Sequence, residues 1–481
     1  MINTGKNTRM RKKGYKAKKA FAGALVAFMI AGLAACGTAG VDEAVSSAEY
    51  LTKEDITVSE TFTDESNGGH AIEVSGEEAN YSNIGVTKTG DADGDDADFY
   101  GENSAVFATE KAALTITDSL IETNGRHANA VFSYGEGTVV NISNSVIETQ
   151  GDCSGGLMTT GGGTMNAENL TINTSGRSSA AIRSDRGGGT VTVTKGYYRT
   201  TGMGSPVIYS TADITVNDAY MESTASQGVV VEGKNSVTLN DATLVADNNT
   251  KNSDNSEWYQ AVMIYQSMSG DAAEGTSSFT ASGGSITNKN GDIFFVTNTA
   301  TDISLSGVEI NNEDEDGLFL RAAAAGWGND GSNGGQVNLN ASGQTINGGI
   351  VVDDVSTLNL YLKNKSAFSG AINTDGQSGD VYVEIEDGST WTLTADSYVS
   401  GLTVSKGSAI DLNSHKLYVD GKEYTAGSAS TGEAFELSTS SGSGGAPDGM
   451  PGGTPPDGEP PEKPDGGFPD GQPPEKPDSS N

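Results

Sequence analysis

The stretches NSAVFATE (Asn103–Glu110) and HANAVFSY (His127–Tyr134) share one pattern: a small residue, a bulky aliphatic residue and usually a second bulky residue. The pattern occurs eleven times: SAVFA at Ser104, NAVFS at Asn129, GGLMT at Gly155, AAIRS at Ala180, SPVIY at Ser205, QGVVV at Gln227, QAVMI at Gln260, GDIFF at Gly291, DGLFL at Asp316, GGIVV at Gly348 and GAINT at Gly370. The intervals are mostly 22 to 26 residues, with three of 31 to 33. Such self-similarity predicts a repeat architecture.

A second phrase with alternating apolar and polar residues lies between many of these copies. It reads LTITDS at Leu114, VNISNS at Val140, LTINTS at Leu170, VTVTKG at Val191, ITVNDA at Ile214, VTLNDA at Val237 and ISLSGV at Ile303. Each repeat therefore contains at least two short strands, separated by turns rich in Gly, Asn, Asp and Ser. Helical repeats are excluded, because no stretch of the body keeps apolar residues at helical spacing over three turns. The pattern predicts an all-β chain wound into roughly 10–13 coils, each strand pairing in parallel with its equivalent one coil away. A propeller or a stacked sandwich is the alternative.

Over roughly residues 70 to 415, this coil length and strand pattern resemble the right-handed parallel β-helix proteins of the pectin-lyase-like superfold. The resemblance implies a groove along the coils in which proteins of this fold hold extended polysaccharides. The resemblance also implies what a polysaccharide lyase of this fold would use: acidic residues that hold Ca²⁺, and an Arg or Lys that takes the proton next to a uronate carboxylate.

The composition is strongly acidic. The formal net charge of the 481 residues is −36, and the first 35 residues hold eight Lys or Arg and no acidic residue. The remaining chain therefore has 20 basic and 64 acidic residues, a balance of −44. Such a surface repels phosphate backbones, so nucleic-acid binding is disfavoured, and it attracts cations, Ca²⁺ included.

The N-terminus has the features of an export signal, with a basic segment followed by an apolar one too short for a comfortable membrane span. Leu33-Ala34-Ala35-Cys36 resembles the lipobox of bacterial lipoprotein precursors. The resemblance implies a signal peptide over residues 1–35, a lipid on Cys36 that anchors the chain to a membrane, and an extracytoplasmic location at the cell surface. An ordinary secretory signal is the alternative. Cys153 is the other cysteine, so the mature chain has no internal disulfide.

The remaining composition divides the chain further. Residues 36–68 are polar and acidic and are interpreted as the lipid anchor and a spacer. Residues 69–437 form the predicted β-helix, which ends in a cap where Asp420-Gly421 suits a tight hairpin. Residues 438–481 are rich in Pro, Gly and Asp, with PPEKPD used twice, and predict a disordered tail.

Alternation along the first phrase assigns its side chains to two faces. The predicted interior row is Val106, Val131, Leu157, Ile182, Val207, Val229, Val262, Ile293, Leu318, Ile350 and Ile372. The predicted outward row is Phe107, Phe132, Met158, Arg183, Ile208, Val230, Met263, Phe294, Phe319, Val351 and Asn373. An exposed apolar row of this length indicates a binding or self-association face, unless the inserts at residues 249–258, 270–290 and 322–336 fold over it. Those inserts carry Trp258, Tyr259 and Trp327, aromatic residues of the kind that stack on sugars.

Catalytic and metal-binding patterns are weak. Arg183, Asp185 and Arg186 are the nearest local match to the lyase residues that the resemblance implies. GDCSGG, which contains Cys153, is similar to the serine-protease Gly-Asp-Ser-Gly-Gly but carries an inserted Cys. A calcium site is suggested by alternate carboxylates in DADGDDAD: Asp91, Asp93, Asp95 and Asp98. A solvated acidic turn is the alternative interpretation of this stretch. The three histidines are widely spaced, so neither a His-based triad nor a zinc site is predicted.

The sequence thus predicts a lipid-anchored surface module for binding or adhesion, with carbohydrate as the preferred ligand. A Ca²⁺-dependent polysaccharide lyase or another glycan-active enzyme is the first alternative, and a structural or self-assembling rod is the second. If the apolar row is the binding face, Phe107→Asp combined with Phe319→Asp weakens binding without unfolding the chain.

Overall fold

The structure is a computed structural model that describes residues 50–251, 253–376, 379–427 and 432–438. These residues belong to one compact unit whose regular secondary structure is almost all β-strand, as the sequence predicted. The described helices are a 3₁₀ turn, Lys53–Asp55, and one short α-helix, α1 (Asp95–Phe99). The predicted signal peptide, Cys36 and the tail after residue 438 lie outside the described residues.

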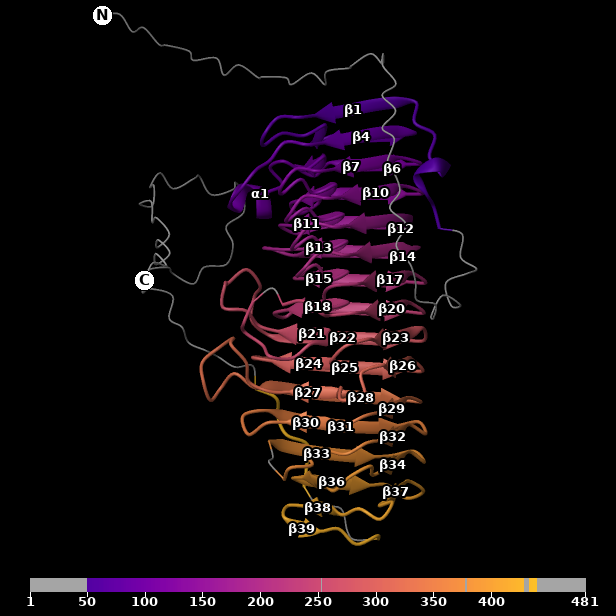
Figure 1. Ribbon diagram of the computed structural model, residues 1–481, viewed down its shortest axis with the longest axis vertical. Helices are drawn as coiled ribbons and strands as arrows, with labels where there is room; N and C mark the ends of the chain where they lie inside the picture. The colour runs from indigo at the N-terminus through magenta and orange to yellow at the C-terminus, as the bar shows by residue number, and fades with distance from the viewer. Residues whose placement is uncertain (1–49, 252, 377–378, 428–431, 439–481) are drawn as a thin grey trace, which may run out of the picture. The chain divides into compact units, whose positions relative to one another are not determined.

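An 11-stranded parallel sheet carries the first phrase of the repeat. Its strands, in order, are β2 (Ile72–Ser75), β5 (Val106–Thr109), β8 (Val131–Tyr134), β11 (Leu157–Thr160), β13 (Ile182–Ser184), β15 (Ile208–Ser210), β18 (Val229–Glu232), β21 (Gln260–Tyr265), β24 (Asp292–Thr297), β27 (Leu320–Ala322) and β30 (Ile350–Val352). Each strand pairs with the strand of the preceding repeat, so successive repeats lie one above another (Figure 1). We call one such layer a rung.

A 21-stranded parallel sheet carries the second phrase. Its strands are β1 (Glu60–Asp64), β3 (Glu78–Ser82), β4 (Ile84–Lys88), β6 (Ala113–Thr117), β7 (Leu120–Thr123), β9 (Val139–Ser143), β10 (Val146–Thr149), β12 (Gly163–Thr174), β14 (Gly189–Thr200), β16 (Asp213–Asn217), β17 (Tyr220–Ser223), β19 (Ser236–Asn240), β20 (Thr243–Ala246), β22 (Thr276–Ser282), β23 (Ser285–Asn288), β25 (Thr299–Ser306), β26 (Glu309–Asn312), β28 (Gly335–Ser342), β31 (Thr357–Lys363), β33 (Asp380–Ile385) and β36 (Gly401–Val404). Most rungs contribute two strands to it, and the long strands β12 and β14 join the two columns. The sheet begins at Glu60, so part of the predicted spacer is strand.

Two small sheets complete the C-terminal rungs. One contains β29 (Thr345–Asn347), β32 (Ala367–Ser369), β34 (Thr390–Thr392) and β37 (Ala409–Asp411); the other contains β35 (Ser397–Val399), β38 (Leu417–Val419) and β39 (Lys422–Glu423). Strands β38 and β39 form an antiparallel hairpin whose turn residues, Asp420 and Gly421, both have positive φ. This confirms the predicted hairpin, because a two-residue turn of this kind needs both residues in the left-handed region.

The main core fills the interior of the rungs and confirms most of the predicted interior row. Three residues of the predicted outward row are placed wrongly, because Ile208, Phe294 and Phe319 pack in this core and are at most 1% exposed. Ile208 aligns with Ile182, and Phe294 aligns with Val262. In these repeats two or three adjacent residues are bulky and apolar, so the phrase alone does not show which residue faces inward. A shift of one residue exchanges the two faces of a strand.

Candidate functional site

The observed outward row of the 11-stranded sheet remains mostly apolar. From β5 to β30 it reads Phe107, Phe132, Met158, Arg183, Tyr209, Val230, Met263, Phe295, Arg321 and Val351. These side chains build two hydrophobic clusters separate from the main core, one around Phe107 and Phe132 and one around Met263 and Phe295. Both clusters are buried, so other segments of the chain cover the row.

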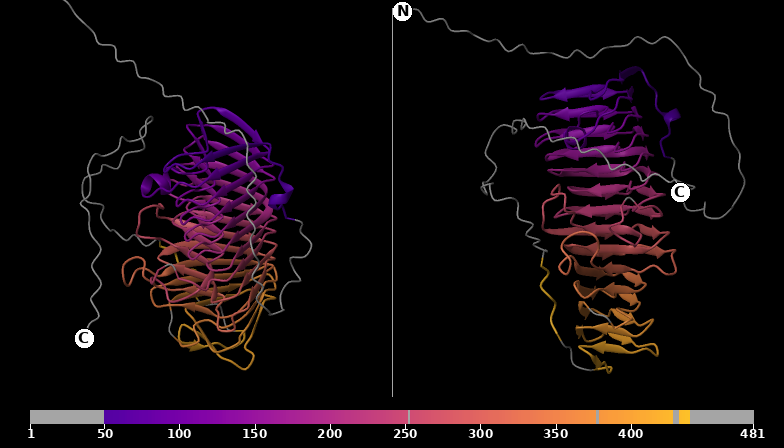
Figure 2. Two further views of the ribbon diagram at one scale, coloured as in Figure 1. Left: turned by 45° about the horizontal axis from the view of Figure 1, so that its top comes forward. Right: turned by 60° about the vertical axis from the view of Figure 1, so that its left-hand side comes forward.

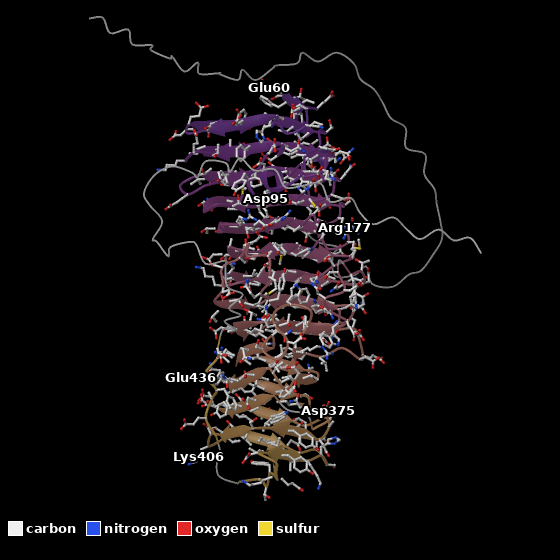
Figure 3. The ribbon with its side chains drawn as sticks, turned by 90° about the vertical axis from the view of Figure 1, so that its left-hand side faces the viewer. Glu60, Asp95, Arg177, Asp375, Lys406 and Glu436 are labelled. Carbon is white, nitrogen blue, oxygen red and sulfur yellow. The ribbon has the colours of Figure 1, made fainter. Side chains whose placement is uncertain are left out.

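The N-terminal cluster is covered by the segment that contains α1. The backbone of Gly101 crosses directly over the cluster, since a Cβ built there would lie 2.5 Å from the Phe107 ring. Thr160 of β11 donates a 2.6 Å hydrogen bond to the carbonyl of Phe99, and His70 stacks on Phe107 with ring centroids 4.7 Å apart. Figure 3 looks onto this side of the rungs and labels Asp95 of α1. The sequence did not predict this cover, because the inserts at residues 249–258, 270–290 and 322–336 do not include the α1 segment.

The C-terminal cluster is covered by the loops that follow β20 and β27, as the sequence allowed. Trp258 packs on Phe295 with ring centroids 5.4 Å apart, and the guanidinium of Arg321 lies 4.5 Å from the Trp258 ring. Trp327 contacts Tyr265 edge to face at 5.2 Å. Loops beside these strands project on the same side as α1 (Figures 1 and 2). The two tryptophans thus lie over the outer face of β21 and β24.

A cavity of about 220 Å³ opens between these loops and the sheet. Its aromatic lining is Tyr209, Trp258, Tyr259, Tyr265 and Trp327. Its amide-bearing lining is Gln227, Asn248, Asn255 and Gln260. The rest of the wall is Gly204, Val230, Thr250, Lys251, Ser253, Ser256 and Met263. The cavity therefore combines half-buried rings with side chains that both donate and accept hydrogen bonds. We call it the aromatic pocket.

Four residues of the predicted binding set meet in the aromatic pocket: Trp258, Tyr259, Met263 and Trp327. Phe107, Phe132 and Met158 lie on the same face but under the α1 segment. The sequence missed Tyr209 and Tyr265. Tyr209 lies in β15 and Tyr265 in β21, and both side chains face outward. Alternation along these two strands would have identified both residues if the register had been known.

A buried carboxyl group supports two of the pocket rings from behind. Glu232 is 1% exposed, and its Oε2 accepts hydrogen bonds from the hydroxyls of Tyr209 and Tyr265. Its Oε1 is buried without a hydrogen-bond partner. Burial raises the pKa of Glu232, although hydrogen bonds from Ser267 and the two tyrosines oppose the shift.

Glu232→Gln should make thermal stability less dependent on pH. Because the pKa of Glu232 is higher in the folded chain than the ordinary 4.5, the folded state retains a proton that the unfolded state releases. The free energy of unfolding therefore falls as pH rises from about 4.5 through the folded pKa. Melting temperatures at about pH 5 and pH 8 should differ more in the wild type than in Glu232→Gln, with exposed Glu309→Gln as the control. Equal pH dependence in Glu232→Gln and wild type would contradict this.

The predicted lyase residues are held in ion pairs. Nη2 of Arg183 lies 2.8 Å from Oδ2 of Asp185, and Nη2 of Arg186 lies 2.7 Å from Oδ1 of Asp271. The guanidinium of Arg186 also lies 3.9 Å from the Phe99 ring, so it fastens the α1 segment to the rungs. Burial raises the pKa of Asp185, although Arg183 opposes the shift. These contacts give both arginines a structural role.

Three of the four aspartates suggested as a calcium site, Asp91, Asp93 and Asp95, contact arginine residues. Asp91 accepts a hydrogen bond from the backbone of Arg126, and Asp93 pairs with the guanidinium of Arg126. Oδ2 of Asp95 lies 3.3 Å from Nη1 of Arg186. Within the described ranges, the group of side chains that gathers potential metal ligands contains one of the four, Asp98, together with His127 and Cys153.

The sequence did not predict that Asp98, His127 and Cys153 meet. His127 and Cys153 occupy equivalent turns of consecutive rungs, both with φ of 55°, and α1 places Asp98 over them. Nδ1 of His127 lies 2.8 Å from Oδ1 of Asp98. Burial lowers the pKa of His127, but Asp98 and Cys153 outweigh it and raise the pKa to about 9. The 26-residue separation of His127 and Cys153, one repeat, was the available signal.

Two findings concern the chain as a whole. Among the residues that the structure describes, no helix is long and apolar enough to cross a membrane. Comparison of the chain with known protein families, with characterised proteins and with solved structures finds no match.

Proposed function

We propose that this protein binds carbohydrate at the aromatic pocket. The observation that carries the proposal is the lining: five aromatic rings and four amide side chains around about 220 Å³. Aromatic rings offer flat apolar faces to the C–H faces of a sugar, while amides match its hydroxyl groups as both donors and acceptors. The size suits one sugar unit or a short segment of a chain.

The proposal includes a lipid-anchored module at the cell surface. It rests on the basic and apolar N-terminal segments and on Leu33-Ala34-Ala35-Cys36. It also includes the finer fold, a right-handed parallel β-helix of the pectin-lyase-like kind. The stacked rungs and the parallel registers support that fold, which gives a rigid surface for the pocket loops.

The test is glycan binding by the full chain carrying Cys36→Ser, which removes the lipid. An array of cell-wall, mucin and plant polysaccharides should retain it selectively. Trp327→Ala should weaken the retained interaction about tenfold or more, because an aromatic anchor at the centre of a site contributes about 1.4 kcal/mol or more. Trp327 is the sharper choice, since Trp258 also packs on Phe295 and Arg321.

Tyr361→Ala is the matched control. Tyr361 is a half-buried aromatic residue on β31, outside the aromatic pocket, so its loss should leave glycan affinity unchanged. Equal affinity of Trp327→Ala and wild type, with both folded, would refute the pocket assignment. Retention of no glycan would refute the carbohydrate proposal itself.

A further inference from the structure

A second cluster, about the α1 segment, brings three different metal-ligating groups together. Asp98 comes from α1, His127 from the turn before β8 and Cys153 from the turn before β11. One ligand atom from each side chain lies within 4.8 Å of the other two. The carboxylate, imidazole and thiol thus converge from three segments that are far apart in the sequence.

The position of the His127 ring gives a second geometric argument for a metal ion at this cluster. The residue is 6% exposed, and its Nδ1 is buried without a hydrogen-bond partner. Oδ1 of Asp98 lies 2.8 Å from this nitrogen, an ion-pair distance at which both atoms could approach one ion. A buried ring nitrogen left without a hydrogen bond is costly, and a metal ion would satisfy it.

From this arrangement we infer that Asp98, His127 and Cys153 bind Zn²⁺. Thiolate, imidazole and carboxylate are the three ligand types that zinc takes in proteins, and three protein ligands leave a fourth tetrahedral position for water. Ca²⁺ is a poor match, because it requires six to eight oxygen ligands. Copper is a competitor with similar ligand preferences, so the test includes it.

The local charges suit a dication. A Cys153 thiolate and the Asp98 carboxylate together neutralise Zn²⁺, while His127 binds it as neutral imidazole. The neighbouring Arg183 is paired with Asp185 at 2.8 Å, so that pair adds no net charge. The ion and its three ligands are therefore neutral together, which favours binding at this partly buried site. The ion would also fasten α1 to two rungs of the 11-stranded sheet.

The test uses the full chain with Cys36→Ser, so that Cys153 is the single thiol. Titration with Co²⁺, a spectroscopic substitute for zinc, should produce a thiolate-to-metal charge-transfer band and tetrahedral d–d bands, and Zn²⁺ should displace it. Cys153→Ser should abolish the charge-transfer band. His127→Ala and Asp98→Asn should each weaken binding by about tenfold or more, since even indirect partners of metal ligands matter to this extent.

Asp96→Asn is the matched control, because Asp96 is an exposed carboxylate on the same helix and should not change the affinity. Circular dichroism establishes that each variant is folded, and Cys153→Ala serves if Cys153→Ser does not fold. Absence of a thiolate band in folded protein, or a band that persists in Cys153→Ser, would overturn the zinc site. Tighter binding of Cu²⁺ alone, with no Zn²⁺ displacement of Co²⁺, would overturn the choice of metal.

Discussion

Phe319→Asp is expected to lower the free energy of unfolding by more than about 5 kcal/mol and to leave little folded protein. Phe319 is 1% exposed in the main core, where its ring contacts Phe294 with centroids 5.6 Å apart. Loss of a buried aromatic ring costs about 3–5 kcal/mol, and an unpaired carboxylate in the same place adds a desolvation penalty. The free energy of unfolding of a whole domain is about 5–15 kcal/mol, so such a loss can leave little folded protein. Urea unfolding followed by circular dichroism measures the loss.

The matched control is Val351→Asp, which places the same carboxylate one rung away. Val351 is half-buried on the outward row and lies beside Arg321, so the expected change is below about 1 kcal/mol. Similar stability of Phe319→Asp and Val351→Asp would contradict the observed register. The burial of Phe319 in the main core also contradicts the expectation from the sequence that Phe319→Asp leaves the fold intact.

Asp64→Asn is expected to lower the free energy of unfolding by about 3 kcal/mol, because it leaves the buried ammonium group of Lys88 without its ion-pair partner. Lys88 is 0% exposed, and its Nζ lies 3.0 Å from Oδ2 of Asp64 and donates to the carbonyl of Ser66. Removal of one partner from a buried pair costs about 3–5 kcal/mol, and partial exposure of Asp64 favours the lower end. The same urea titration provides the measurement.

Two comparisons sharpen this prediction. The double variant Asp64→Asn with Lys88→Met should recover much of the loss, because it leaves no buried charge. Glu423→Gln breaks the exposed pair with Lys416 and should leave stability unchanged. A single variant Asp64→Asn as stable as wild type would show that Lys88 does not need its partner.

The contribution of the Asp64–Lys88 pair to stability should depend on pH. Burial raises the pKa of Asp64, but Ser66 and Lys88 outweigh this effect and lower the pKa. The contribution of the pair should therefore disappear in acid as pH falls below about 3.8.

The register at Phe294 shows how far sequence reasoning reached. The phrase GDIFF identified a strand, and β24 occupies it. Both Ile293 and Phe294 pack in the main core, and Phe295 is the residue that faces the aromatic pocket loops. When neighbouring residues are all apolar, alternation alone does not show which of them faces inward. The register of β24 was set by its pairing with β21 and β27. The same limit applied at Ile208.

The candidate sites divide in the same way. Trp258, Tyr259 and Trp327 were identified from residue type alone, because loop aromatics are conspicuous in an acidic, Gly-rich chain. The proximity of His127 and Cys153 was not predicted, because the two residues are 26 positions apart in the sequence. In the structure this separation corresponds to one rung. Asp98 was assigned to a calcium-binding turn, since its partners come from later rungs.

The sequence by itself determined the parallel, all-β repeat and the approximate position of its strands. Alternation and turn residues act over a few residues, so each repeat carries that information locally. The tertiary structure alone decided which of two apolar neighbours faces inward, that the α1 segment covers Phe107 and Phe132, and that Asp98 meets His127 and Cys153. These outcomes depend on the packing of segments from different rungs, and the side chains that make such contacts leave no periodic pattern in the chain.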